Sequence, residues 1–210
     1  MVEKHLFIGA HPDDIEFGAG ASIAKSTSLG IECHTLVFSD CHETITDDSD
    51  SPGKIVSESV QALQSLGVQS ENMNWETFPL RRFNEKRQEI LDILISQYRG
   101  INWGRIYIPN TFDTHQDHSV ISQESIRAFK FTSLFGYELP WNNVDMDIKA
   151  FNSVNEEFLR RKIEALSKFN SQKDRFFSDE SKIRSVLEFR GLQIGMKYAE
   201  GFQLIRHIEK

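Results

Sequence analysis

The architecture of this chain follows from one stretch near its start, Phe7-Ile8-Gly9-Ala10-His11-Pro12-Asp13-Asp14-Ile15-Glu16. Its apolar beginning predicts a buried strand, and Gly9 and Ala10 leave room for the backbone to turn. A small-residue helix is predicted directly afterwards, from about Gly18 to Leu29. A strand that passes through a short polar turn into a helix is the repeating unit of α/β folds, and such sheets place their chemistry at the carboxyl ends of their strands.

The remainder of the chain repeats this alternation. Strands are predicted over about 33–39, 73–80, 105–109, 134–140 and 151–154, and helices over about 53–66, 84–99, 118–131 and 155–169 and from Asp179 onward. The pattern is typical of an α/β fold with a mostly parallel sheet flanked by helices. The Asp/Ser/Thr-rich stretch 40–52 predicts a loop. Because the sequence contains no linker, repeat or low-complexity tract, residues 1–210 are expected to form a single domain.

The composition narrows the classes of partner and compartment. With 24 Lys and Arg against 31 Asp and Glu, the formal net charge is −7, which argues against nucleic acid or an anionic membrane as the main partner. No run of about 18 apolar residues is present, so no membrane span is expected, and the first residues lack the pattern of a signal peptide. Cys33 and Cys41 form neither a CxxC pair nor a disulfide framework, which favours a cytoplasmic location.

A second polar segment follows another predicted strand. After the strand 105–109 comes Asn110-Thr111-Phe112-Asp113-Thr114-His115-Gln116-Asp117-His118. Two strand ends that each deliver His and Asp could supply one metal ion, since a catalytic zinc site takes three N or O ligands and keeps a fourth position open. Taken alone, the first turn is equally well explained as a helix cap, with Asp13 or Asp14 at the N-cap. The two segments together favour a metal site.

Both segments resemble a known family. His11-Pro12-Asp13-Asp14 together with His115-x-Asp117-His118 is similar to the zinc-dependent N-acetylglucosaminyl de-N-acetylases, the PIG-L/LmbE-like family. A third block, Phe189–Gly195 followed by Tyr198-Ala199-Glu200, resembles the C-terminal active-site segment of that family. The resemblance spans nearly the whole chain. It implies a three-layer, Rossmann-like (LmbE-like) α/β fold and hydrolysis of the acetamide group of an amino sugar.

The resemblance also implies a role for each polar residue of the two motifs. The implied metal ligands are His11, Asp14 and His118. The metal would be Zn²⁺, or Fe²⁺, which a His/His/Asp set also suits. Asp13 matches a general base that takes a proton from the attacking water. His115 would lie across the substrate carbonyl, and Asp117 would hydrogen-bond its imidazole, favouring the protonated form that stabilises an oxyanion. An alternative set uses both His115 and His118 as ligands, since residues i and i+3 are neighbours on a helical turn.

Three further residues are candidates for substrate binding. Arg82 could hold a phosphate or a sugar hydroxyl, whereas Arg190 and Gln193 are candidates through the family resemblance alone. The sequence therefore predicts a cytoplasmic zinc hydrolase that deacetylates an N-acetylated amino sugar, a glycoside or nucleotide-linked sugar of glycoconjugate or small-thiol biosynthesis. Two alternatives stay open: an amidase of the same fold acting on a non-acetyl amide, and a metal- or sugar-binding module without catalysis. A homo-oligomer is compatible with each of these readings.

Overall fold

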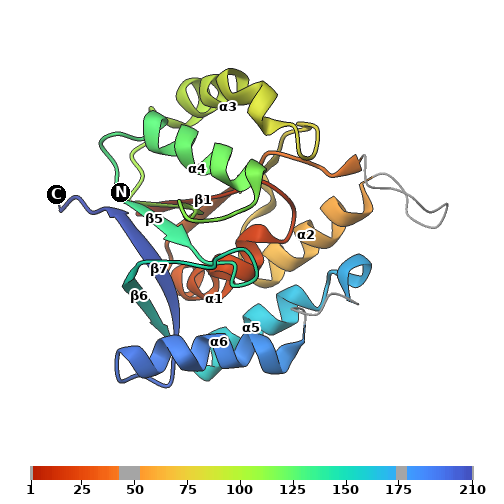
Figure 1. Cartoon of the computed structure of the whole chain (residues 1–210). Helices are drawn as coiled ribbons and strands as arrows, with labels where there is room; N and C mark the ends of the chain where they lie inside the picture. The colour runs from red at the N-terminus through yellow and green to blue at the C-terminus, as the bar shows by residue number, and fades with distance from the viewer. Residues whose placement is uncertain (1, 43–52, 174–178, 210) are drawn as a thin grey trace.

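The computed structural model describes residues 2–42, 53–173 and 179–209, which form three layers with a sheet in the middle (Figure 1). The sheet has seven strands in the order β3-β2-β1-β4-β5-β7-β6. The strands are β1 Lys4–Gly9, β2 Glu32–Val37, β3 Met73–Trp75, β4 Arg105–Pro109, β5 Leu134–Tyr137, β6 Ile148–Val154 and β7 Tyr198–Arg206. Strands β1 to β5 pair in parallel, whereas β7 is antiparallel to both β5 and β6. Residues 43–52 of the predicted loop lie outside the described residues.

Helices cover both faces of the sheet (Figure 1). They are α1 Asp14–Ser28, α2 Lys54–Ser65, α3 Arg87–Ile93, α4 Gln116–Ala128, α5 Glu156–Leu166 and α6 Glu180–Gln193. Because successive strand residues point to opposite faces, Leu6 and Ile8 pack in the core beneath α3 and α4, while Phe7 packs in the core beneath α1, α2, α5 and α6. The prediction of a mostly parallel sheet flanked by helices is confirmed.

The strands predicted over 73–80 and 134–140 end earlier, at Trp75 and Tyr137, and three other elements differ more from the sequence prediction. Helix α1 begins at Asp14 rather than near Gly18, so the polar turn is shorter than expected. The helix predicted over 84–99 is divided into a 3₁₀ turn, α3 and a π-turn. Strand β7 was not predicted, because its buried stretch includes Glu200 and a charged residue inside a sheet is disfavoured unless a distant partner neutralises it.

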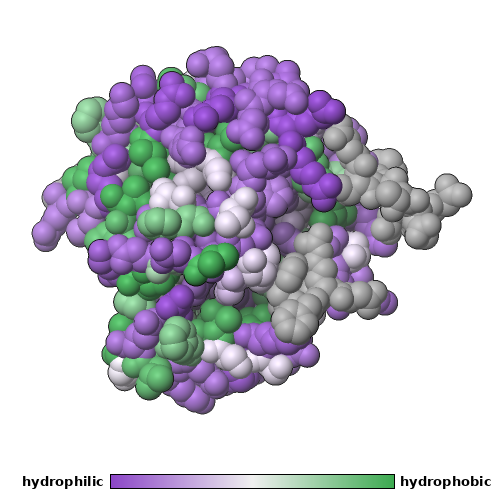
Figure 2. Space-filling view, in the orientation of Figure 1, coloured by the Kyte–Doolittle hydropathy of each residue, from purple (hydrophilic) through white to green (hydrophobic). Residues whose placement is uncertain are grey.

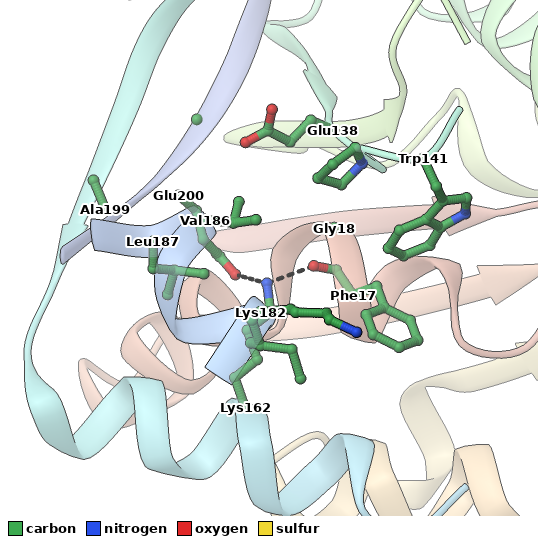
Figure 3. Close-up of a pocket in the computed structure, with 13 residues that line it drawn as sticks. Phe17, Gly18, Glu138, Trp141, Lys162, Lys182, Val186, Leu187, Ala199 and Glu200 are labelled. Atoms are coloured by element: carbon green, nitrogen blue, oxygen red, sulfur yellow. Dashed lines mark hydrogen bonds and ion pairs between the residues drawn. The ribbon is translucent and has the colours of Figure 1, made fainter. Parts of the chain in front are cut away.

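That partner is Lys162, and the buried ion pair ties β7 to two helices (Figure 3). Lys162 Nζ, from α5, lies 2.6 Å from Glu200 Oε1 and also donates a hydrogen bond to the carbonyl oxygen of Phe17 in α1. The Glu200 carboxylate also accepts hydrogen bonds from the backbone amides of Ala21 (3.0 Å) and Ser22 (2.7 Å). Because an unpaired buried charge is costly, the pair fixes α1 and α5 against the antiparallel part of the sheet.

The surface is largely hydrophilic, and apolar side chains gather over and beside α6 in the lower part of Figure 2. At the end of this helix Phe189, Leu192 and Met196 are 56%, 76% and 51% exposed. Among the helices of the described residues, none combines the length and the apolar character that crossing a membrane requires.

Gly18 lies where α1 approaches Tyr137 of β5 closely, and it provides a test of this packing. A Cβ atom at Gly18 would stand 2.2 Å from Cδ2 of the fully buried Tyr137 ring. Helix propensity alone would make Gly18→Ala stabilising by about 1 kcal/mol. We expect it instead to destabilise the protein by about 1–3 kcal/mol, because overpacking a rigid core outweighs propensity. Denaturant unfolding measures the difference.

The matched control is Gly20→Ala in the same helix. The nearest atoms to its Cβ would be methylene carbons of Lys162, at 3.1 Å and beyond, a contact that is relieved by a shift of a few tenths of an ångström. Equal stability of the two variants would contradict the close contact between Gly18 and Tyr137.

Candidate metal centre and active site

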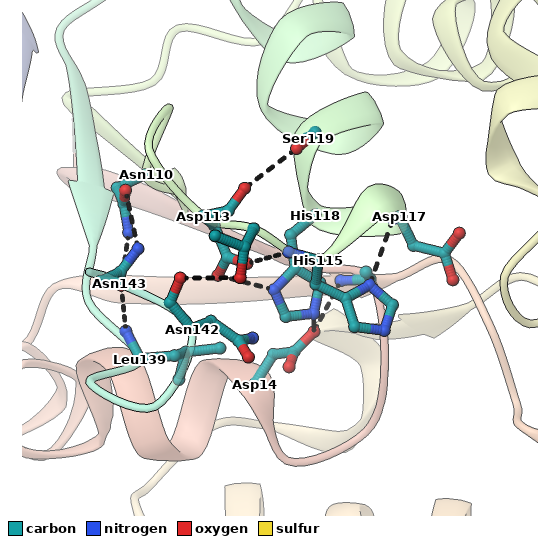
Figure 4. Close-up of polar contacts among 12 residues, drawn as sticks. Asp14, Asn110, Asp113, His115, Asp117, His118, Ser119, Leu139, Asn142 and Asn143 are labelled. Atoms are coloured by element: carbon teal, nitrogen blue, oxygen red, sulfur yellow. Dashed lines mark hydrogen bonds and ion pairs between the residues drawn. The ribbon is translucent and has the colours of Figure 1, made fainter. Parts of the chain in front are cut away.

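Two turns at the carboxyl ends of neighbouring parallel strands form the site (Figure 4). Strands β1 and β4 are paired, with Phe7 opposite Tyr107, so the turns that follow them leave the sheet side by side. The turn after β1 carries His11 and Asp14, and the segment after β4 carries His118 at the start of α4. The structure thus brings together the two motifs that are far apart in the sequence.

The turn after β1 is closed by the carboxylate of Asp14. Its Oδ2 atom accepts hydrogen bonds from the backbone N–H groups of Ala10 (3.1 Å) and His11 (2.8 Å). The preceding residue, Asp13, is the N-cap of α1 and has a left-handed φ of 95°, which Asp tolerates better than most residues. Both acidic residues are buried. The turn therefore presents two adjacent carboxylates at the amino end of a helix, where the helix dipole favours negative charge.

Three side-chain atoms from the two turns form a nearly equilateral triangle. His11 Nδ1 lies 3.2 Å from His118 Nε2, and His118 Nε2 lies 3.2 Å from Asp14 Oδ2. The third edge, from Asp14 Oδ2 to His11 Nδ1, is 3.5 Å. Ligand atoms bound at about 2.0–2.1 Å to a tetrahedral zinc ion are about 3.3 Å apart. The three atoms could therefore hold such an ion.

The other nitrogen of each imidazole is bound by a carboxylate. His11 Nε2 donates to Asp117 Oδ2 at 3.0 Å, and His118 Nδ1 donates to Asp113 Oδ2 at 2.8 Å. Because a carboxylate only accepts, each ring, when neutral, keeps its hydrogen on the nitrogen beside the carboxylate and turns the lone pair of the other nitrogen toward the triangle. Asp113 was not singled out from the sequence. A metal-binding histidine usually has a carboxylate partner. Because Asp113 is in the same segment as His118, a search for such a partner could have identified it.

The carboxylates shift the pKa values of both histidines. Burial alone would lower the pKa of His118, but Asp14 and Asp113 outweigh it and raise the pKa to about 10. The pKa of His11 is also raised, against the effect of burial, by Asp117 and Asp14. Burial opposes ionisation of Asp14, yet His118 and His11 hold the pKa of this carboxyl far below its usual range. The cluster therefore attracts positive charge.

His115 lies beside the triangle, at the N-cap of α4. Its Nδ1 accepts a hydrogen bond from the backbone N–H of Asp117 at 3.2 Å. Its ring stacks on that of His118, with centroids 4.5 Å apart and planes at 25°, and lies edge-on to His11 at 4.9 Å. A ring nitrogen of each of these three histidines lies within 4.8 Å of the others, which keeps His115 a candidate ligand.

The prediction that the Asp117 carboxylate hydrogen-bonds the His115 imidazole is wrong. That carboxylate binds His11 and two backbone amides, while only the backbone of Asp117 reaches His115. Burial, together with the nearby His118 and His11, lowers the pKa of His115 to about 4. The imidazole of His115 is therefore neutral near pH 7, and not the cation that the sequence suggested.

The predicted substrate-binding residues lie in two places. Arg82 is exposed and pairs with Glu85 at 3.3 Å. Arg190 makes a two-pronged ion pair with Glu138, at 2.9 and 2.6 Å, and donates a hydrogen bond to Gln193 at 2.9 Å. Arg190 and Gln193 are thus in contact with one another, next to the end of β5.

The loop that follows β5 is fastened to the segment that carries the second motif. Asn143 exchanges side-chain hydrogen bonds with Asn110, and the carbonyl oxygen of Asn142 accepts from the N–H and the hydroxyl of Thr114 at 3.1 and 3.0 Å. In Figure 4 the side chain of Asn142 extends toward Asp14. The loop therefore forms one wall of the site.

Comparison with known proteins gives relatives over most of the chain. The family model described as PIG-L, GlcNAc-PI de-N-acetylase, matches residues 6–129. An Escherichia coli K12 protein called uncharacterized deacetylase YaiS is 34% identical over 172 residues, which are 79% of this chain and 90% of that protein. Diacetylchitobiose deacetylase of Thermococcus kodakarensis is 24% identical over 227 residues, covering 97% of this chain and 84% of that protein.

A solved structure with the same fold belongs to a protein named for a different activity. GalB, the 4-carboxy-2-hydroxymuconate hydratase of Pseudomonas putida KT2440, superposes with a TM-score of 0.77 at 17% identity, covering 100% of this chain and 99% of that one. Similarity at this level shows the fold and not the reaction. The family match is more specific, since it spans most of the chain and includes both His/Asp motifs. The chain belongs to the PIG-L family of GlcNAc-PI de-N-acetylases.

Proposed function

We propose that this protein is a metal-dependent hydrolase that removes the acetyl group from an N-acetylated amino sugar, a glycoside or nucleotide-linked sugar. One observation carries the proposal: His11, His118 and Asp14 present three converging ligand atoms, and each imidazole is backed by a carboxylate. The names of two relatives, both deacetylases, support the reaction class. A metal-dependent amidase acting on a non-acetyl amide remains the alternative for the same site.

The donor set fits a zinc ion, with Fe²⁺ as the second choice for two imidazoles and a carboxylate. When bound, the ion supplies Lewis acidity at the amide carbonyl and a water of lowered pKa. The alternative ligand set would replace Asp14 with His115. It has less support, because the rings of His115 and His118 are stacked with their planes only 25° apart, so their in-plane lone pairs do not converge on one point.

The neighbouring residues supply the proton transfers and the orientation. Asp13 is the proposed general base; it adjoins a ligand, is buried, and has a backbone conformation of the kind that persists at functional sites. His115 is proposed as a neutral donor. Since its Nδ1 accepts a backbone N–H, its hydrogen is on Nε2, which can stabilise the carbonyl oxygen as negative charge develops. Asp117 then acts through His11, whose tautomer and orientation it holds.

The remaining parts of the proposal concern the substrate contacts and the setting. Arg82, which is exposed, would contact a distal group of the substrate. Arg190 and Gln193 would line the substrate-binding site, with Arg190 held in place by Glu138. The chain would act in the cytoplasm as one domain spanning 1–210. A single sheet runs through the described residues, and Cys33 and Cys41 are buried and form no disulfide within them, which suits a reducing compartment.

Acetate release tests the function. We expect zinc-loaded protein to release acetate from at least one member of a panel containing N-acetylglucosamine, diacetylchitobiose and UDP-N-acetylglucosamine, because the site combines an ion, a base and an oxyanion donor. Matched N-formyl and N-propionyl sugars distinguish the non-acetyl amidase. Binding of these sugars without hydrolysis of any of them would point to a non-catalytic module.

Metal content tests the ligand set. We expect His11→Ala, Asp14→Ala and His118→Ala each to lose most of the bound metal, since each removes one of three protein ligands. His115→Ala should retain it. Elemental analysis of the purified variants is the measurement, and His34→Ala is the control, because His34 is a half-buried histidine paired with Glu32 on β2. Metal lost from His115→Ala but kept by Asp14→Ala would select the alternative set.

Asp13→Asn separates the proposed base from the ligands. Asn has nearly the shape of Asp and tolerates the left-handed backbone, so the turn and the metal should be kept. Activity should fall by about 10²–10⁴, the usual contribution of a general base. Acetate release and metal content are measured on the same preparation. Activity within tenfold of the unsubstituted protein would assign the base to another group.

A further inference from the structure

A cavity of about 360 Å³ lies beside α1, with Phe17 and Gly18 of this helix in its lining (Figure 3). It lies between α1, the loop after β5, α5, α6 and the start of β7. Its walls are mainly apolar and include Phe17, Trp141, Ile183, Val186 and Leu187. Helix α6, which forms one wall of this cavity, is also where apolar side chains come to the surface in Figure 2.

Most charged groups of the cavity are neutralised within the protein. At its floor Lys162 is bound to Glu200 at 2.6 Å, and at its upper edge Glu138 is bound by Arg190 in two hydrogen bonds. Lys182, half-buried, completes the lining. A ligand entering this space thus meets carbon surface and paired charges. Such a lining favours an apolar group over a phosphate or a second sugar.

The position of the cavity relates it to the metal centre. Asp14 and Gly18 are four residues apart on α1 and so lie on the same face, about 6 Å apart along the helix axis. The loop after β5 separates the two spaces. Asn142 of this loop faces the metal centre in Figure 4, while the neighbouring Trp141 packs edge-on against Phe17, with ring centroids 5.1 Å apart, at the cavity. The two spaces therefore adjoin the same helix and opposite sides of the same loop.

We propose that this cavity binds an apolar aglycone attached to the N-acetylated amino sugar, an inference that rests on the proposed function. In a 2-acetamido sugar the anomeric carbon is bonded to the carbon that carries the acetamide. The aglycone then begins a few ångströms from the scissile amide, which matches one turn of α1. An enclosed space of about 150 Å³ holds one benzene ring, so this cavity has room for about two such rings or an alkyl chain of similar bulk.

A series of β-glycosides of N-acetylglucosamine tests the inference. With methyl, butyl and octyl aglycones, kcat/KM for acetate release should rise with chain length, and the octyl compound should exceed the methyl compound by about tenfold or more. Val186→Phe, which fills the cavity, should bring the octyl-to-methyl ratio close to one. Val60→Phe is the matched control: Val60 is an equally half-buried valine on α2, outside the cavity, so this variant should keep the ratio.

A second variant tests the inference in case Val186→Phe does not fold. Trp141 is 41% exposed, so Trp141→Ala should fold normally and still lower the octyl-to-methyl ratio by removing a wall of the cavity. Equal kcat/KM for all three glycosides, or a ratio that neither cavity variant changes, would overturn the inference while leaving the deacetylase function in place.

Binding decides the inference separately if neither these glycosides nor any sugar of the panel used to test the proposed function releases acetate, the result that would overturn that function. The zinc-loaded Asp13→Asn protein is titrated calorimetrically with the methyl and octyl glycosides. Binding of the octyl compound about tenfold or more tighter than the methyl compound, lost when Val186→Phe is added, supports the cavity assignment. Equal affinity for the two glycosides overturns it.

Discussion

The carboxylate of Asp14 is the group on which the arrangement of the site depends. It accepts two backbone N–H bonds, from Ala10 and His11, and so closes the turn between β1 and α1. The same oxygen stands 3.2 Å from Nε2 of His118. A carboxylate held by two amides is fixed in direction and favoured in its ionised form. Because one group shapes the turn and faces the histidines, the entry into α1 and the position of the site cannot vary independently.

The charges around this carboxylate explain why the site suits a cation. Asp14, Asp113 and Asp117 surround two imidazoles in a buried place. Uncompensated negative charge is costly there, and the raised pKa of His118, about 10, shows that the cluster takes up protons to reduce it. A divalent cation would give the same compensation while requiring neutral imidazoles, so binding of a metal would be coupled to proton release. The composition of the cluster thus favours a metal independently of the family assignment.

The loop after β5 couples the metal centre to the rest of the molecule. Through Asn143 it is fastened to the segment after β4, and through Trp141 it packs on Phe17 of α1. Below it, the buried pair of Lys162 and Glu200 holds α1, α5 and β7 together. The candidate metal centre and the apolar cavity therefore adjoin the same loop and the same helix. A substrate that contacts both would be positioned at its acetamide and at its aglycone by parts of one framework.

Local patterns were enough to predict the alternating strands and helices, the mostly parallel sheet and the meeting of the two His/Asp motifs, because strands of a parallel sheet deliver their carboxyl ends to one edge. These patterns did not predict which side chains form hydrogen bonds and ion pairs with one another. Asp117 is only two residues from His115, yet its carboxylate binds His11, which follows a different strand. The same holds for the fold. Glu200 is unfavourable in a buried strand unless Lys162, from a distant helix, lies beside it. Such contacts join residues that are far apart in the sequence and meet only in the folded chain. The spacing of residues along the sequence therefore does not predict them.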